Sequence, residues 1–406
     1  MLLTKSKKQV ILLYGATRTG TLLGVVSSII NTRFMDTGDY GDVRYVQNIL
    51  SFIASLLLFG YFLSGSRLLA LSNDEYKSRR IRGCMVTILI AASTVLIVSC
   101  FILFFIFKRD NPIVAHLFLV SAPVCLYPLF HNYINTTAQG DNHIGRLASS
   151  RFVPAVFYIP VAYFIYSNFG ATSSRMILLQ WGLNTTILLM IIVSTRPLFK
   201  DLKPIMMELN RENRDYGLQL YIGSLVMVAT NYIAGITIGI FNGDNSEVGF
   251  YTLALTVTSP LSTLPSIIGT TYFKKFATEK KIPQKVLKYS LTLTILSCVL
   301  FIIFIKPIVS FLYPDRYYIV GTYASWLAVG FSIHGLGDMI NRYLGSQGQG
   351  KSIRNSSFFN GLFKIFGFTV LVYFFNTNGA IMTNIICSSI YFATLLYYYK
   401  KYTLNF

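Results

Sequence analysis

Long apolar segments follow one another along the whole of this 406-residue chain. A helix needs roughly 20 predominantly apolar residues to cross a bilayer, and twelve segments approach or exceed that length. They span about residues 10–34, 45–71, 84–107, 113–137, 152–168, 176–194, 216–241, 249–273, 287–306, 319–343, 356–375 and 379–399. Because backbone polar groups in lipid need internal partners, these segments predict an all-α integral membrane protein with twelve transmembrane helices.

The composition agrees with this prediction. Hydrophobic residues make up 53% of the chain and charged residues only 13%, whereas about a quarter of the residues in soluble domains are charged. The formal net charge is +19, yet the Lys and Arg residues stand mostly in short runs between the apolar segments. Such runs are typical of the cytoplasmic side of a membrane protein. We therefore expect the chain to contact membrane lipids and not nucleic acid.

The basic residues also predict the topology. With a cytoplasmic N-terminus, the cytoplasmic connections receive most Lys and Arg, including Arg82, Arg146 and Arg151. The outside turns receive only Arg33, Arg44, Lys108, Arg109, Arg175, Lys306 and Arg316. This asymmetry places both termini in the cytoplasm, and the first apolar segment is expected to be an uncleaved span because no A-x-A site follows it. The outside turns are too short for a catalytic domain, so we expect no enzyme activity and no catalytic residue.

The two halves of the chain correspond at an offset of 208 residues. Gln139-Gly140, followed by Arg146, matches Gln347-Gly348, followed by Arg354, and both copies come after an even-numbered span. A repeat of six spans that starts on the same side each time predicts two six-helix lobes, related by a pseudo-two-fold axis along the membrane normal. The predicted parts are an N-terminal lobe (residues 1–194), a cytoplasmic linker (195–215) and a C-terminal lobe (216–406).

Arg18 is the charged residue deepest in the first span. An arginine at the centre of a span costs about 2.5–3.5 kcal/mol on insertion scales unless it faces protein or water. Either it binds an anion in a water-filled cavity, with Tyr14 beside it as a candidate face for a sugar ring, or it bonds backbone carbonyls of another helix. The residue 208 positions later is Val226. The charge is therefore not part of the shared scaffold, which favours a role for Arg18 in binding.

Two further basic residues lie within predicted spans. Lys364 is about ten residues into the eleventh span, roughly 15 Å from its end, where it either contacts a ligand or pairs with another span residue. Arg67 closes the second span and either extends to the membrane interface or reaches the cavity. Arg67 and Lys364 are both candidates for substrate binding.

Two polar stripes run along even-numbered spans at helical spacing. His334, Asp338 and Arg342 form one stripe in the tenth span. They predict either a local salt bridge or a gate or proton-linked site, because a histidine can titrate near neutral pH. The other stripe, in the fourth span, contains His131, which is either a buried structural residue or a substrate-binding one.

Signatures of metal and cofactor chemistry are missing from the sequence. It has no HExxH motif and no CxxC pair, and its five cysteines fall in apolar segments, which predicts reduced core residues. The segment Gly345–Ser352 matches the GxxxxGKS spacing of a phosphate loop. A phosphate loop joins a strand to a helix in a soluble domain, however, so we expect a polar turn between two spans. No metal and no cofactor is predicted.

The first hairpin of each half carries a family resemblance. The cues are Asp39-Tyr40-Gly41-Asp42 and Val46-Gln47-Asn48 in one half, and Glu247-Val248-Gly249-Phe250-Tyr251 and Phe273-Lys274-Lys275-Phe276-Ala277 in the other. With these motifs the sequence resembles the oligosaccharide-lipid flippases of the bacterial O-antigen (Wzx) type. They belong to the larger superfamily of multidrug and polysaccharide exporters.

This resemblance implies a function and a location. The implied cargo is an undecaprenyl-diphosphate-linked O-antigen or related repeat unit, moved across the bacterial inner membrane by alternating access during lipopolysaccharide biosynthesis. A polysaccharide polymerase and a chain-length regulator are implied partners. Cationic cavity residues are implied as well, and Arg18 and Lys364 fit that role. The alternatives are a multidrug or cation antiporter, which would favour a carboxylate in the first-lobe spans, and a membrane polysaccharide polymerase, which would carry a large outside loop.

Overall fold

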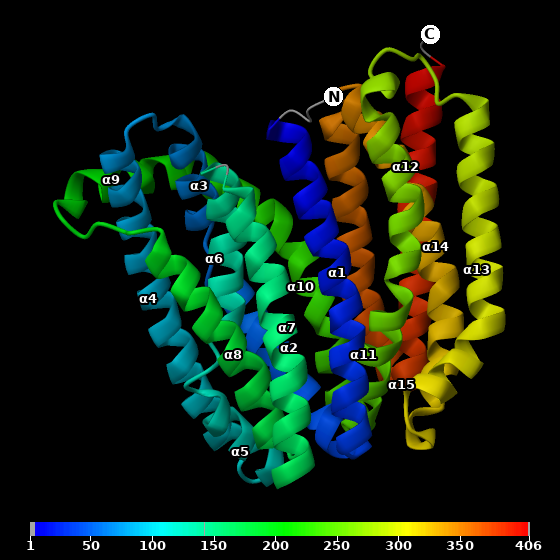
Figure 1. The fold of residues 1–406 in the computed structure, drawn as a ribbon. Coiled ribbons are helices and arrows are strands. Elements are labelled where there is room, and N and C mark those ends of the chain that lie inside the picture. Colours follow the sequence, from blue (N-terminus) through cyan, green and yellow to red (C-terminus); the bar gives the residue numbers. More distant parts are fainter. Residues whose placement is uncertain (1–4, 142, 405–406) are drawn as a thin grey trace. The chain divides into compact units, whose positions relative to one another are not determined.

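The computed structural model describes residues 5–141 and 143–404, without the side chains of residues 5–14, 16–18, 144, 223–224, 226–229 and 274. The described residues form helices and turns and contain no strand (Figure 1), so the all-α prediction is confirmed. The chain divides into two compact units, unit 1 (Met1–Leu225) and unit 2 (Val226–Phe406). The division falls inside one helix, whereas the sequence predicts a boundary in the linker at residues 195–215.

Unit 1 is built around three pairs of packed helices. Helix α1 lies along α7, α3 packs on α6, and α4 packs on α5. The helices of this unit are α1 (Lys5–Phe34), α2 (Thr37–Leu56), α3 (Tyr61–Leu71), α4 (Glu75–Phe107), α5 (Pro112–Ser121), α6 (Tyr127–Gly140), α7 (Ile144–Phe169), α8 (Ser173–Ser194) and α9 (Leu202–Glu212), and a π-turn (Asn213–Gly217) leads into α10 (Leu218–Asn242).

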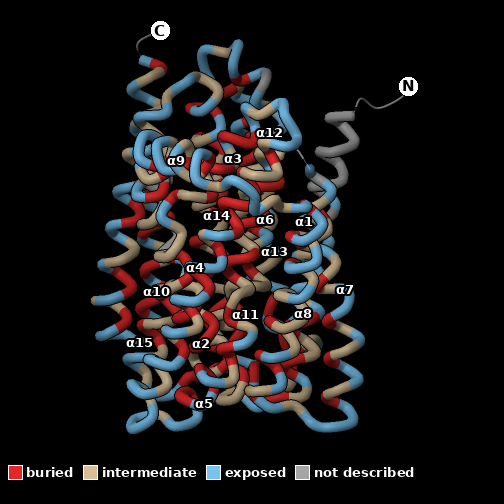
Figure 2. The backbone as a smooth tube through the Cα atoms, turned by 90° about the vertical axis from the view of Figure 1, so that its left-hand side faces the viewer, coloured by how far each residue is buried: buried red, intermediate tan, exposed pale blue. Residues whose placement is uncertain are grey.

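Unit 2 is organised around one central helix, α14. Its helices after α10 are α11 (Ser246–Thr258), α12 (Pro260–Phe276), α13 (Gln284–Leu312), α14 (Ile319–Ser346) and α15 (Gly350–Thr403), with a 3-10 turn (Asp315–Tyr317) before α14. Helix α14 packs against α11, α12, α13 and α15, and much of it is buried (Figure 2). Its glycines permit this, because a Cβ on Gly335 would lie 2.6 Å from the Ser262 carbonyl oxygen.

The second predicted span is broken in the structure. Helices α2 and α3 meet at an angle of 58°, and at the break Phe59 and Gly60 both have positive φ. The freed carbonyl of Phe59 accepts a hydrogen bond from Asn213 Nδ2 at 3.1 Å. A Cβ on Gly60 would lie 2.4 Å from the backbone of Gly217. The break is therefore fixed by the π-turn that follows α9.

Helix α15 reverses direction at Asn376, where the backbone leaves the helical region (φ 53°, ψ −138°). The reversal falls between the predicted spans 356–375 and 379–399. On its two sides the chain packs tightly against itself, because a Cβ on Gly379 would lie 2.0 Å from the Leu371 carbonyl oxygen. A Cβ on Gly367 would likewise lie 2.6 Å from the side chain of Thr383. The α15 helix is thus a hairpin of two long segments (orange to red in Figure 1).

The described helices have the character of membrane spans. Six are long and apolar enough to cross a bilayer, and the α2–α3 pair makes a seventh if it is counted as one bent span. Apolar side chains also cover the outer face of α13, where Phe304 and Phe311 are 53% and 81% exposed. Such a surface needs lipid rather than water around it. The chain is therefore a multi-pass membrane protein, and the number twelve stays a prediction.

Candidate cavities in the two units

Unit 1 contains a polar cavity of about 430 Å³ between α1, α6, α7 and α8. Its wall combines small residues of α1 with polar and aromatic side chains of the other three helices. The polar and aromatic wall residues are Thr21, Ser27, Tyr127, His131, Ser150, Arg151, Tyr158, Gln180 and Asn184. Among these described residues Arg151 supplies the permanent positive charge. The cavity can therefore receive an anionic group.

The position of Arg151 adds a residue that the sequence prediction did not include in the site. The topology argument assigned Arg151 to a cytoplasmic connection, because the fifth apolar segment begins only at residue 152. In the structure α7 begins at Ile144, so Arg151 lies two turns inside a helix. Its Nη2 donates to Asn135 Oδ1 at 3.4 Å. The polar stripe that contains His131 was a signal for this pair, since Asn135 follows His131 at i+4.

His131 lies in the wall of the same cavity. Its ring is 5.7 Å from the ring of Tyr127, at an angle of 48°, and Tyr127 also contacts Trp181 at 5.9 Å. Tyrosine and tryptophan rings of this kind offer apolar faces together with polar edges. The predicted candidate His131 is thus brought together with Arg151, a residue that the sequence analysis did not include in the site.

Unit 2 contains a second polar cavity, of about 420 Å³, between α10, α11, α12, α14 and α15. Its lysine, histidine and aspartate lining residues are Lys364, His334 and Asp338. The Lys364 ammonium forms no ion pair or hydrogen bond with any residue in the described part of the chain. The structure therefore places three predicted residues, from two separate spans, in one cavity.

Tyr391 organises the α14 side of this cavity. Its ring stacks on His334 with centroids 4.7 Å apart, and its hydroxyl donates to Asp338 Oδ1 at 3.2 Å. The same hydroxyl accepts a hydrogen bond from Asn341 Nδ2 at 2.7 Å. Asp338 therefore binds a tyrosine from α15, and no described ion pair joins it to His334 or Arg342. The exposed Arg342 packs its stem against Gly269 instead.

The remaining predicted residues lie elsewhere or outside the described side chains. Arg67 is exposed, forms an ion pair with Glu212 and lies over the Tyr216 ring at 4.8 Å. It is not among the lining residues of the unit 1 cavity. The side chains of Tyr14 and Arg18 lie outside the described residues, although α1 itself contributes Thr21 to that cavity.

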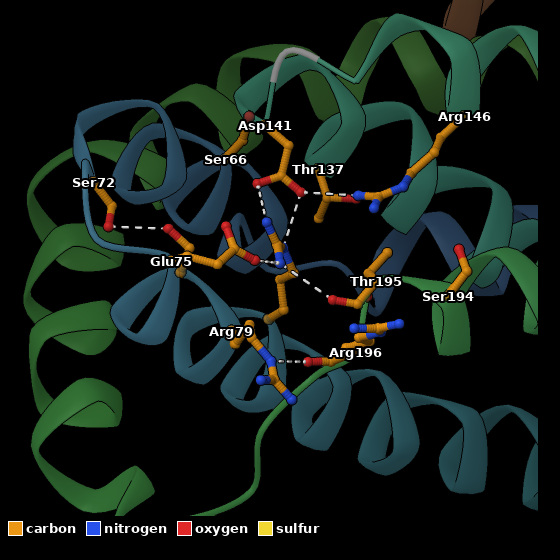
Figure 3. Close-up of polar contacts among 12 residues, drawn as sticks. Ser66, Ser72, Glu75, Arg79, Thr137, Asp141, Arg146, Ser194, Thr195 and Arg196 are labelled. Carbon is orange, nitrogen blue, oxygen red and sulfur yellow. Dashed lines mark hydrogen bonds and ion pairs between the residues drawn. The ribbon is translucent and has the colours of Figure 1, made fainter.

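An ion cluster surrounds the buried Arg82 in unit 1, and Figure 3 shows its partners Glu75, Asp141 and Thr195. Arg82 is 4% exposed, and its Nε and Nη2 donate to the two carboxylate oxygens of Asp141 at 2.9 and 3.0 Å. Its Nη1 donates to Glu75 Oε1 at 2.9 Å and to the Thr195 carbonyl at 3.2 Å. Arg146 lies 3.6 Å from Asp141. The cluster thus joins the ends of α4, α6, α7 and α8.

The fold is shared with known membrane transporters. The lipid II flippase MurJ, in an inward-closed conformation, matches 97% of this chain and 90% of its own length, with a TM-score of 0.73 and 15% identity. An inward-facing multidrug resistance MATE family transporter of the MOP superfamily matches 97% of this chain and 98% of its own (TM-score 0.66, 15% identity). A MOP superfamily transporter from Pyrococcus furiosus gives a TM-score of 0.58, 15% identity and coverages of 98% and 96%. At these identities the likeness shows the fold alone.

A sequence-family model gives a more specific result. The family described as polysaccharide biosynthesis protein matches residues 6–273, which is more than half of the chain. No curated protein matches the chain significantly. The chain belongs to the polysaccharide biosynthesis protein family.

Proposed function

We propose that the protein is a flippase for an undecaprenyl-diphosphate-linked oligosaccharide, the repeat unit of an O-antigen or a related surface polysaccharide. The proposed location is the bacterial inner membrane, with both termini in the cytoplasm. A polysaccharide polymerase and a chain-length regulator are the proposed partners. The family match supports the polysaccharide assignment, and the fold of a lipid II flippase supports a lipid-linked cargo.

The proposed architecture is two six-helix lobes that alternate access across the membrane. Three helix pairs, α2 with α3, α5 with α6 and α11 with α12, each make one broken crossing in this proposal. Division of α15 at Asn376 gives two more crossings. With α1, α4, α7, α8, α10, α13 and α14, the count reaches the predicted twelve. The proposed lobes keep their predicted limits, residues 1–194 and 216–406, with the linker at 195–215.

The observation that carries the proposal is a cation in the polar cavity of each unit, Arg151 in one and Lys364 in the other. A diphosphate that enters a region of low dielectric constant needs charged partners, because Coulomb interactions there are strong and hydration is lost. Lys364 is free for this role in the described structure. The rings of Tyr127 and His131 offer faces to which a sugar can bind. Arg18 is proposed as a further cation because Thr21, one turn later on α1, lines the same cavity.

A cation antiporter is the second candidate, and one observation favours it. Asp338 lies in the unit 2 cavity beside His334, and an acid next to a titratable imidazole can exchange protons. We therefore retain His334 and Asp338 as candidates for a proton-linked site. Within a flippase they would couple proton movement to transport, and within an antiporter they would bind the cation. The two functions are separated by measuring lipid flipping and cation uptake in variants that lack the cavity cations Arg151 and Lys364.

The test is transport of a fluorescent undecaprenyl-diphosphate oligosaccharide in proteoliposomes that contain the purified protein. The variants Arg151→Gln and Lys364→Gln should each reduce the flipping rate by about tenfold or more, since a hydrogen bond to a charged group contributes about 1.5–3 kcal/mol. Arg67→Gln serves as the control, because Arg67 pairs with Glu212 outside the unit 1 cavity. Full activity in both cavity variants would contradict the proposal. Cation uptake without any lipid movement would establish the antiporter instead.

A further inference from the structure

A separate polar cavity of about 400 Å³ lies where the two ends of α15 meet. Lys351 and Ser352 line it from the first turn of the helix, and Tyr398 and Lys401 line it from the last turns. Both lysines lie 25 residues along the chain from Asn376, so the reversal at that residue brings them to the same end of unit 2. The lining contains two cations and no carboxylate.

Hydrogen bonds beneath the lining residues hold the wall of this cavity in place, and most of them involve Gln347. Gln347 Nε2 donates to the carbonyls of Phe276 and Glu279, at 2.5 and 3.0 Å. The Tyr402 hydroxyl donates to Gln347 Oε1 at 2.9 Å, so this lining residue is tied to the turn after α14. Tyr343 adds a hydrogen bond from its hydroxyl to the Lys280 carbonyl at 2.7 Å. The cavity is thus pre-formed, which reduces the entropic cost of binding.

Two backbone N–H groups at the start of α15 have no hydrogen-bond acceptor in the described structure. The Gln349 carbonyl accepts hydrogen bonds from the backbone N–H groups of Ser352 and Ile353, at 3.1 and 3.2 Å. No side chain caps the helix, and the described backbone offers no partner to the N–H groups of Gly350 and Lys351. Free N–H groups at the start of a helix attract anions. Here they adjoin a cavity that also holds two lysines.

The charge in this cavity is uncompensated within the described part of unit 2. Lys351 and Lys401 are exposed, and neither forms an ion pair there. In unit 1 the predicted repeat places Asp141 at the position of Gln349, and Asp141 binds Arg82 and lies beside Arg146. Unit 2 therefore has a neutral residue where unit 1 carries its own anion.

We propose that this cavity binds a phosphate group. Lys351 and Lys401 would bind its oxygens with charge-assisted hydrogen bonds, and Ser352 and the free N–H groups of the first turn would complete the donors. The segment Gly345–Ser352 has the spacing of a phosphate loop but joins two helices, so the site is not a nucleotide-binding loop of the usual kind. The phosphate can come from an anionic lipid headgroup or from a soluble compound, and the site does not depend on the cargo of the transporter.

The experiment uses the purified full chain in an uncharged detergent and measures its thermal unfolding midpoint. One arm adds inorganic phosphate against chloride at equal ionic strength, and the other adds phosphatidylglycerol against phosphatidylcholine in mixed micelles. A bound ligand raises the midpoint by mass action. The double variant Lys351→Gln/Lys401→Gln should weaken the apparent affinity by about tenfold or more. Lys285→Gln/Lys400→Gln is the matched control, because it removes the same charge from exposed residues that do not line the cavity.

Each outcome decides the proposal. A response to phosphatidylglycerol alone, lost in the cavity variant and kept in the control, identifies a lipid headgroup as the source. A response to inorganic phosphate alone, with the same pattern, identifies a soluble one, and responses to both establish the shared chemistry. The proposal is overturned if the wild-type chain responds to neither ligand. It is equally overturned if the control loses as much affinity as the cavity variant, since the effect would then be general charge screening.

Discussion

Two turns that the predicted repeat pairs differ in how their basic residues are neutralised. They are the turn after α6 in unit 1 and the turn after α14 in unit 2. In unit 1, Asp141 lies between two arginines and is 6% exposed. In unit 2, the residue at the predicted equivalent position is Gln349, and the nearby lysines face an open cavity. Near the first turn, Asp141 neutralises arginines of the same unit. Near the second turn, the lysines have no anionic partner among the described residues. In the proposed scheme, one copy of the predicted repeat holds a structural clamp and the other copy holds the proposed phosphate site.

The largest effect is expected from Arg82→Ala. Arg82→Ala removes the two-point partner of Asp141 and leaves only Arg146, at 3.6 Å, beside the carboxylate. Loss of one partner of a buried ion pair costs about 3–5 kcal/mol. The free energy of unfolding, measured by titration of detergent micelles with SDS, should fall by this amount. Lys77→Ala on the same helix is the control, because its pair with Glu208 is about 40% exposed on both sides and contributes about 0–1 kcal/mol. Equal losses in the two variants would show that the cluster is no clamp.

Asp141→Asn should have a smaller effect in the same assay. The amide keeps the shape of the side chain and one acceptor oxygen, and Arg82 retains Glu75 and the Thr195 carbonyl. The expected loss is about 1–3 kcal/mol, the cost of an imperfectly satisfied buried group. The variant also makes unit 1 resemble unit 2 at this turn. A loss as large as that of Arg82→Ala would mean that Asp141 alone holds the cluster.

The reverse exchange, Gln349→Asp, tests the other side of the comparison. A carboxylate in the cavity wall would supply an internal partner for the lysines and repel a second anion. The affinity for inorganic phosphate or phosphatidylglycerol should fall by about tenfold, while the unfolding midpoint without ligand should change little, since Gln349 is only half-buried. Unchanged binding in this variant would show that the ligand does not contact the start of α15. Gln349→Glu and Gln349→Asn separate the effect of charge from that of side-chain length.

The sequence predicts the helical class and the two segments of α15, because long apolar runs and the short polar stretch around Asn376 are local signals. It misses the break between α2 and α3, since Phe59 and Gly60 lie inside a continuous apolar run and their partner Asn213 is far along the chain. It also leaves Arg151 out of the candidate site, because a positive charge at the edge of an apolar run does not reveal that a helix has already begun.

The candidate sites show the same limit at the level of side chains. The stripe of His334 and Asp338 could be predicted from helical spacing, and the structure places both in one cavity with Lys364. The partner of Asp338 could not be predicted, because Tyr391 is 53 residues later. The same holds for Arg82 and Asp141, which are 59 residues apart. Pairing across helices depends on how they pack, and periodicity within one helix carries no information about it.

The smallest effect, and one of opposite sign, is expected at Ser290. The predicted repeat places Ser290 at the position of Arg82, so it is the neutral counterpart of the arginine in the clamp. Ser290 is fully buried, and its hydroxyl has no hydrogen-bond partner in the described structure. Ser290→Ala removes an unsatisfied polar group and should leave the free energy of unfolding unchanged or raise it by up to about 1 kcal/mol. A loss of stability there would reveal a hidden partner for the hydroxyl. The two units would then differ less than their charges indicate, since Ser290 would form a polar contact in unit 2 where Arg82 does so in unit 1.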